Sequence, residues 1–210
     1  MTESEAQDWL RDRAGVSRET FVLLHRFTEL LREEQSRQNL VAASTLDHLW
    51  ARHIVDSAQL LAHFPQNTRT CADLGAGAGF PGMVLALIGP ARVTLIESRR
   101  LRVDFLRRAV VALGLVDRVE IIADRAERLQ GRAFDVLTAR AFAPLDRLFP
   151  IGLGFAAPNT RWLLPKGRNA IAELDAARRS WQGAFHILPS VTDAEAGILV
   201  AEQVQRRRSA

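Results

Sequence analysis

The chain has 210 residues, of which 48% are hydrophobic, and its formal net charge is +4. This length supports one sizeable core with a small appended segment, and the absence of a run of about 18 apolar residues excludes a transmembrane helix. Almost all of the positive charge comes from arginine, because Lys166 is the only lysine, and a charge of this size only weakly indicates a nucleic-acid partner.

The cysteine content and the polar first residues indicate the compartment. Cys71 is the only cysteine, so no disulfide can form within the chain. Residues 1–18 lack the apolar segment of a secretory signal. No group of cysteines and histidines has zinc-ligand spacing, and no metal site is expected. The sequence therefore predicts a cytoplasmic protein with no membrane association.

Residues 1–65 are predicted to form an N-terminal helical extension packed on the core. Apolar residues recur at helical spacing within residues 21–31. A second helix is predicted to begin at Ser44 or Thr45, because Ser44 and Asp47 have the spacing of a capping box.

From residue 70 onward, short apolar strands alternate with helices. This alternation predicts an α/β fold with a doubly wound parallel sheet and helices on both of its faces. Two late strands have no helix between them and are predicted to form an antiparallel hairpin at the C-terminal edge of the sheet. We assign residues 66–205 to this domain and residues 206–210 to a basic tail. The strand candidates are 70–74, 92–96, 119–122, 134–138, 161–164, 185–188 and 198–203, and the helix candidates are 82–88, 99–113, 145–155 and 170–181.

A glycine-rich turn follows the first predicted strand. Residues 73–82 read Asp-Leu-Gly-Ala-Gly-Ala-Gly-Phe-Pro-Gly, and glycines permit a tight turn and close approach of a ligand to the backbone. Glu97 ends the next predicted strand, where a carboxylate can accept both hydroxyls of an adenosine ribose. These residues predict a cleft for a cofactor that contains adenosine.

Two cofactor classes use such a turn. Residues 77–82 match a dinucleotide fingerprint. However, Asp73 lies two residues before the first glycine, where it disfavours a pyrophosphate and favours the ammonium or sulfonium of S-adenosylmethionine. The bulky Phe80-Pro81 pair also crowds the fingerprint, and a helical extension precedes the sheet. We therefore expect S-adenosylmethionine as the cofactor, with a nicotinamide oxidoreductase as the less favoured alternative.

Polar residues also follow three later strands. The segment 124–127 can bracket an adenine ring, although Asp124 can instead cap a helix. Arg140 follows the fourth strand at a position that lines the crevice of such sheets. It is a candidate for the cofactor carboxylate or a substrate phosphate, and a solvated surface arginine is the alternative. Lys166 ends the fifth strand on the same side.

The sequence lacks residues that activate a poor nucleophile. The fourth strand is not followed by the Asn/Asp-Pro-Pro-aromatic turn common in enzymes that methylate exocyclic amines of bases. A thiolate for methylation of pyrimidine C5 would have to come from Cys71, which we expect to be buried. There is no tyrosine. Guanine N7 needs no such activation, so we expect catalysis by positioning alone and name no catalytic residue.

These segments resemble the bacterial 16S rRNA 7-methylguanosine methyltransferases, also called glucose-inhibited division protein B. The resemblance spans residues 20–205, and its most specific parts are Arg-His-x-x-Asp-Ser at 52–57 and Phe-Pro-Gly at 80–82. It implies a class I S-adenosylmethionine-dependent methyltransferase, which has a Rossmann-like sheet. The other matching segments are Asn39-Leu40, 73–79, 125–127, Arg140-Ala141 and Lys166-Gly167.

The resemblance also implies a substrate and site residues. The target is guanine N7 in a decoding-region loop of 16S rRNA, reached in the small ribosomal subunit or its assembly intermediate. Lys166 and His53 are the candidate substrate-binding residues, although His53 and Asp56 can alternatively be a hydrogen-bonded pair that fixes the N-terminal helices to the sheet. We expect a monomer, because the sequence shows no obligate dimer face. The implied cofactor contacts are Gly75, Phe80, Glu97, Ala126, Glu127 and Arg140.

Two alternative functions stay open. A small-molecule methyltransferase with the same turn would act on a metabolite and would not bind RNA. A noncatalytic RNA- or ribosome-binding protein on this fold would bind RNA without the cofactor. The intact set of Asp73, Gly75, Gly77 and Glu97 disfavours the noncatalytic alternative.

Overall fold

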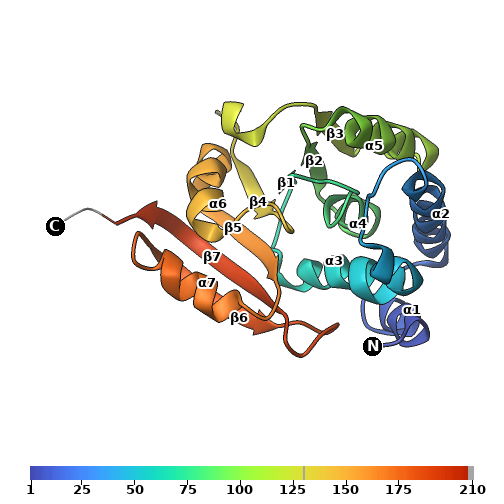
Figure 1. Ribbon diagram of the computed structural model, residues 1–210, viewed down its shortest axis with the longest axis horizontal. Helices are drawn as coiled ribbons and strands as arrows, with labels where there is room; N and C mark the ends of the chain where they lie inside the picture. Colours follow the sequence, from blue (N-terminus) through green and yellow to red (C-terminus); the bar gives the residue numbers. More distant parts are fainter. Residues whose placement is uncertain (130, 208–210) are drawn as a thin grey trace.

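The computed structural model describes residues 1–129 and 131–207, which form a seven-stranded sheet covered by helices (Figure 1). The strand order is β3-β2-β1-β4-β5-β7-β6. The first five strands are parallel, and β7 runs antiparallel to both β5 and β6. The predicted doubly wound sheet with an antiparallel hairpin at its C-terminal edge is confirmed. The strands are β1 Thr70–Leu74, β2 Arg92–Ile96, β3 Val119–Ile122, β4 Phe134–Thr138, β5 Ala156–Lys166, β6 Trp181–Pro189 and β7 Gly197–Arg206.

Helices cover both faces of the sheet. They are α1 Glu3–Asp12, α2 Arg18–Gln35, η1 Ala43–His48, η2 Trp50–Val55, α3 Asp56–Ala58, η3 Gln59–His63, α4 Gly82–Ile88, α5 Arg100–Ala112, η4 Ala126–Arg128, α6 Leu145–Gly152, η5 Leu153–Phe155 and α7 Ala170–Ala177. In Figure 1, α6 and α7 lie toward one side of the sheet, whereas α1 to α5 lie toward the other.

Successive residues of each strand enter opposite cores, because side chains alternate between the two faces of a sheet. Cys71 and Leu163 belong to one hydrophobic cluster, which also contains Phe27 of the N-terminal helices. Ala72 and Trp162 belong to the second cluster, beneath α6 and α7. The N-terminal helices therefore share a core with the sheet.

Residues 43–63 form a series of short turns, where the sequence predicts one continuous helix. A 3₁₀ turn, a π turn, a short α-helix and a second 3₁₀ turn follow one another. The predicted capping box at Ser44 and Asp47 is wrong, because η1 begins after Ala42 without a side-chain cap.

A long-range contact explains this irregular backbone. The carboxylate of Glu3 in α1 accepts hydrogen bonds from the backbone N–H groups of Trp50 and Ala51, at 3.0 and 2.9 Å. Short 3₁₀ and π turns often mark segments that carry function. Here they form the region that faces the carboxyl ends of the strands.

The C-terminal part of the chain differs from expectation in its bounds. The predicted helix 170–181 ends at Ala177, because Trp181 already pairs with Arg206 at the start of β6. Arg206, which the sequence assigns to a tail, is the last residue of β7, and the backbone N–H of Arg207 donates to Ser180 O. Residues 208–210 of the predicted tail lie outside the described residues.

The described ranges contain neither a membrane-spanning helix nor a group of metal ligands. In residues 1–129 and 131–207, no helix is long and apolar enough to cross a membrane. Over the same ranges, no three acidic, histidine or cysteine side chains gather as metal ligands would.

Candidate active site

Two adjacent clefts lie at the carboxyl ends of the parallel strands, where ligands bind in open α/β sheets. The Glu97 cleft, of about 760 Å³, is lined by the ends of β1 and β2 and by residues 123–128 after β3. The Lys166 cleft, of about 940 Å³, is lined by the loops after β4 and β5, the turn between β6 and β7, and part of residues 45–56. Ala141 and Phe142 line both clefts, so this loop forms the boundary between them.

Gly75 at the end of β1 packs directly against Phe142. Its φ is +72°, a conformation that suits glycine. A Cβ atom on Gly75 would lie 2.3 Å from Cδ2 of Phe142, which is closer than real Cβ atoms approach other heavy atoms. Its backbone N–H donates to Ile96 O at 2.8 Å, which fixes the turn to β2. Glycine is therefore required both by the backbone angle and by the aromatic ring that covers it.

Asp73 supports the glycine turn from beneath. Its side chain is fully buried, and Oδ2 accepts a hydrogen bond from the backbone N–H of Gly82 at 2.8 Å. The pKa of Asp73 is raised to about 7, because burial and, to a smaller extent, the charge of Glu97 outweigh the lowering by the Gly82 hydrogen bond and Arg140. Asp73 lines neither cleft, so it lies behind the glycine turn and not in the wall of a cavity.

Two buried oxygens below the clefts have no hydrogen-bond partner among the described residues. They are Oδ1 of Asp73 and Oγ1 of Thr138, and these two residues are register partners on the neighbouring strands β1 and β4. A buried acceptor without a donor is costly and is often found at functional sites. Oδ1 of Asp73 is therefore an unpartnered acceptor buried beneath the glycine turn.

Glu97 is held rigidly at the base of its cleft. The residue is 5% exposed, Oε2 accepts from Gly77 N–H at 3.0 Å, and Oε1 accepts from Arg99 N–H at 2.8 Å. Each carboxylate oxygen can accept a further hydrogen bond. Ala126 and Glu127 of η4 line the same cleft. Four of the predicted cofactor contacts therefore meet in one cavity: Gly75, Glu97, Ala126 and Glu127.

Phe80, another predicted cofactor contact, lines neither cleft. It is 4% exposed, and its ring stacks on His53 with centroids 4.9 Å apart and packs against Phe27 at 5.3 Å. The ring points into the N-terminal helices because they bury it in the core shared with the sheet. Besides His53, Phe80 contacts Arg140, whose guanidinium carbon lies 5.2 Å from the ring centroid.

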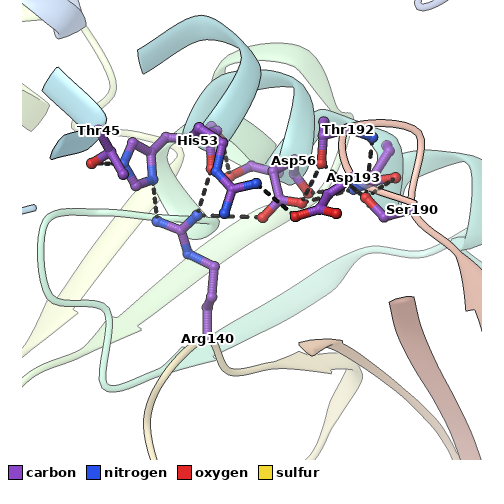
Figure 2. Close-up of polar contacts among 10 residues, drawn as sticks. Thr45, His53, Asp56, Arg140, Ser190, Thr192 and Asp193 are labelled. Atoms are coloured by element: carbon purple, nitrogen blue, oxygen red, sulfur yellow. Dashed lines mark hydrogen bonds and ion pairs between the residues drawn. The ribbon is translucent and has the colours of Figure 1, made fainter. Parts of the chain in front are cut away.

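Arg140 extends from the loop after β4 to the N-terminal helices (Figure 2). One terminal nitrogen lies 2.8 Å from Nδ1 of His53, and the other donates to Arg52 O at 3.2 Å and lies 3.4 Å from Oδ2 of Asp56. The side chain is 20% exposed, which excludes the solvated surface arginine. His53 and Asp56 therefore both hold Arg140, in place of the mutual pair that was one alternative.

The turn between β6 and β7 closes the same network (Figure 2). Thr192 donates its hydroxyl to Oδ1 of Asp56 at 3.1 Å, and Arg52 forms an ion pair with Asp193 at 2.8 Å. No motif or spacing in the sequence indicates that this turn belongs to the site. Only the antiparallel hairpin brings it beside residues that lie more than a hundred positions earlier.

Lys166 at the end of β5 also lines this cleft. Its Nζ is 2.8 Å from Oε1 of Glu173, and the side chain is 12% exposed. The same oxygen accepts from the backbone N–H of Leu145 at 2.8 Å. Sequence reasoning missed Glu173 and Phe142. An aromatic residue two positions after Arg140 was the available signal for Phe142, whereas Glu173 gave none.

The acids and bases described in the Lys166 cleft all have partners. His53 is neutral, because burial, followed by the charges of Arg140 and Arg52, lowers its pKa to about 3. The Cys71 thiol is buried away from the cleft, and burial raises its pKa well above the usual value. The titratable residues that line the cleft are Arg52, His53, Asp56, Arg140, Lys166, Glu173 and Asp193, each in a hydrogen bond or ion pair.

A protein-family model described as GidB, rRNA small subunit methyltransferase G, matches residues 21–198. The chain belongs to this family. The ribosomal RNA small subunit methyltransferase G of Rhizorhabdus wittichii is 52% identical, over 99% of this chain and 95% of that protein. The protein of the same name from Zymomonas mobilis is 46% identical, over 99% of this chain and 97% of that protein.

Solved structures show the same fold at low identity. A mutant of MtNAS in complex with S-adenosylmethionine aligns with a TM-score of 0.59 and 17% identity, over 95% of this chain and 83% of that chain. An O-methyltransferase from Bacillus cereus in complex with SAH aligns with a TM-score of 0.58 and 16% identity, over 84% and 90%. The predicted class I methyltransferase fold is confirmed.

As a member of the methyltransferase G family, the chain is an S-adenosylmethionine-dependent methyltransferase. The residues present fit this cofactor. Glu97 keeps cleft-facing acceptors for ribose hydroxyls, and Gly75 lines the same cleft. The unpartnered Oδ1 of Asp73 supplies negative charge beneath the turn.

Proposed function

We propose that this protein methylates guanine N7 in a decoding-region loop of 16S rRNA. The observation that carries the proposal is the Lys166 cleft, in which every described acid and base already has a partner. N7 of guanine has an available lone pair and carries no proton that must be removed, so it needs no free base. Family membership supports RNA as the substrate.

The cofactor would be held in the Glu97 cleft, where S-adenosylmethionine supplies an electrophilic methyl group on a sulfonium. Glu97 would accept the ribose hydroxyls, and Ala126 and Glu127 would border the adenine. The methionine end of the cofactor would extend toward the adjacent Lys166 cleft. Arg140 lines that cleft and would bind the carboxylate of the methionine end. The protein then contributes orientation and exclusion of water, and no proton moves.

The RNA would enter from the side of the Lys166 cleft. Lys166 and His53 both line this cleft, and an ammonium there can bind a phosphate or guanine O6. The N-terminal extension, residues 1–65, contributes Arg52, His53 and Asp56 to the site. We therefore treat it as part of the substrate-binding region, with residues 66–205 as the methyltransferase domain.

The proposal includes the cellular setting. We expect a monomer in the cytoplasm that acts on the small ribosomal subunit or on its assembly intermediate.

The decisive experiment measures transfer of labelled methyl groups to small subunits, and to their deproteinised rRNA, from a strain that lacks this gene. Label mapped as 7-methylguanosine in one loop supports the proposal. Bound cofactor without label on either RNA would favour a small-molecule substrate, and RNA binding without cofactor would favour the noncatalytic alternative.

Replacing Lys166 by alanine tests the substrate wall. We expect Lys166→Ala to lower kcat/KM for the RNA substrate about tenfold, because a charge-assisted contact to RNA is lost. Cofactor affinity should stay unchanged. Arg178→Ala is the matched control. Arg178 lies just past the end of α7, and its exposed guanidinium forms an ion pair with Asp175. Equal kcat/KM values for the two variants would show that Lys166 does not contact the RNA substrate.

A further inference from the structure

We propose that His53 is a positioning residue, whose imidazole is held in one neutral tautomer by Thr45 and orients the guanidinium of Arg140 in the Lys166 cleft. The inference rests on the proposed function in one respect, namely that Arg140 binds the cofactor carboxylate. His53 itself would touch neither the methyl group nor the base.

The hydrogen-bond directions assign the tautomer. The Thr45 hydroxyl donates its proton to Ala42 O at 2.8 Å. Its oxygen therefore accepts from Nε2 of His53, which lies 2.9 Å away. Nε2 consequently carries the proton, and Nδ1 presents a bare lone pair. Arg140 has only donors, so its terminal nitrogen donates to Nδ1 at 2.8 Å.

The surroundings keep this imidazole neutral. The charged groups that face it are Arg140 and Arg52, and Asp56 lies on the far side of Arg140. Burial and the two arginines lower the pKa of His53 to about 3. A protonated ring would lose the acceptor for Arg140 and would repel it, so the neutral form is the one that can orient the guanidinium.

Contacts on other sides fix the plane of the guanidinium. The ring of Phe80 contacts both the imidazole of His53 and the guanidinium of Arg140. The second terminal nitrogen of Arg140 is held by Arg52 O and by the carboxylate of Asp56. Among the described residues, the Nε of Arg140 has no hydrogen-bond partner. One edge of the guanidinium therefore remains free for an anion, as bidentate recognition of a carboxylate requires.

Substitutions at His53 separate positioning from simple packing. The amide oxygen of asparagine can replace the lone pair of Nδ1, whereas glutamine reaches toward the position of Nε2 and Thr45. We expect His53→Ala and His53→Gln to weaken S-adenosylmethionine binding about tenfold in calorimetry, because one hydrogen bond to a charged group is lost. His53→Asn should stay within about threefold of wild type. His63→Ala is the matched control, a half-buried histidine beside Arg161, and should leave binding unchanged.

A spectroscopic measurement tests the tautomer directly. Long-range proton–nitrogen NMR spectra should show His53 protonated at Nε2 and not titrating above pH 5, and Thr45→Val should shift the Nε2 signal. Unchanged binding in His53→Ala would overturn the proposal. So would a folded His53→Asn variant that binds as weakly as His53→Ala, or titration of His53 between pH 5 and 8. Cofactor binding is measured without RNA. The effect of the His53 variants can therefore be interpreted even if the rRNA assignment fails.

Discussion

Gly75→Ala should abolish methyl transfer and weaken S-adenosylmethionine binding by at least about 100-fold. An alanine at a φ of +72° is strained by about 1–2 kcal/mol. Its Cβ would also lie 2.3 Å from Cδ2 of Phe142, so either the turn or the ring must move. Both movements alter the boundary between the two clefts. Calorimetry with the cofactor and the methyl transfer assay measure the two effects separately.

Gly114→Ala is the control for backbone strain. Gly114 has a φ of +67°, yet nothing lies within 4 Å of a Cβ built on it. It should lose about 1 kcal/mol of stability and no cofactor affinity. The double variant Gly75→Ala with Phe142→Ala removes the clash and keeps the strain. If Gly75→Ala behaves like Gly114→Ala, the close contact with Phe142 has no functional role.

Asp73→Asn should stabilise the protein at pH 8 and impair its activity. The folded-state pKa of Asp73 is about 7, raised mainly by burial from 3.8. From about pH 4 to 7 the folded state retains a proton that the unfolded state has lost, so this group makes stability fall as pH rises. Above pH 7 Asp73 is ionised in the folded state, and burial of its charge lowers the free energy of unfolding by the full amount. A neutral asparagine should restore about 2–4 kcal/mol of that free energy. At pH 5, about one unit above the unfolded-state pKa, the gain in stability should be smaller, about 1–2 kcal/mol.

The functional effect of Asp73→Asn has the opposite direction. Loss of the negative charge beneath the glycine turn should weaken binding of the cationic cofactor about tenfold. Thermal denaturation at pH 5 and pH 8, together with calorimetry, measures both effects. An equal change in stability at the two pH values would show that the carboxyl group does not titrate in this window.

Asp135→Asn provides a control of opposite sign. Burial raises the pKa of Asp135, but hydrogen bonds from Arg69 and Thr70 outweigh it and leave the pKa below its usual value. Its stabilising contribution is therefore present above the unfolded-state pKa and is lost as pH falls through the folded-state pKa. Asp135→Asn should destabilise the protein at pH 8, where Asp73→Asn stabilises it.

The positions of the first four strands and the cofactor turn could be predicted from the sequence alone. The predicted bounds of β1 to β4 match the structure, because each is a short apolar run with a polar or glycine-containing segment after it. The glycine turn and Glu97 were identified for the same local reason, since both depend on neighbours within one βαβ unit. These signals depend on residue types and spacing, which the chain carries without its tertiary contacts.

Other parts of the site were decided only by tertiary structure. Glu3 holds residues 50 and 51 from almost fifty positions away, which produces irregular turns where periodicity predicts a helix. Arg140 looked like a solvated arginine or a ligand contact, yet its direction is set by His53 and Asp56 from another segment. Local sequence carries the propensity of each element, whereas the direction of a buried polar side chain depends on partners that only the fold brings within hydrogen-bond distance.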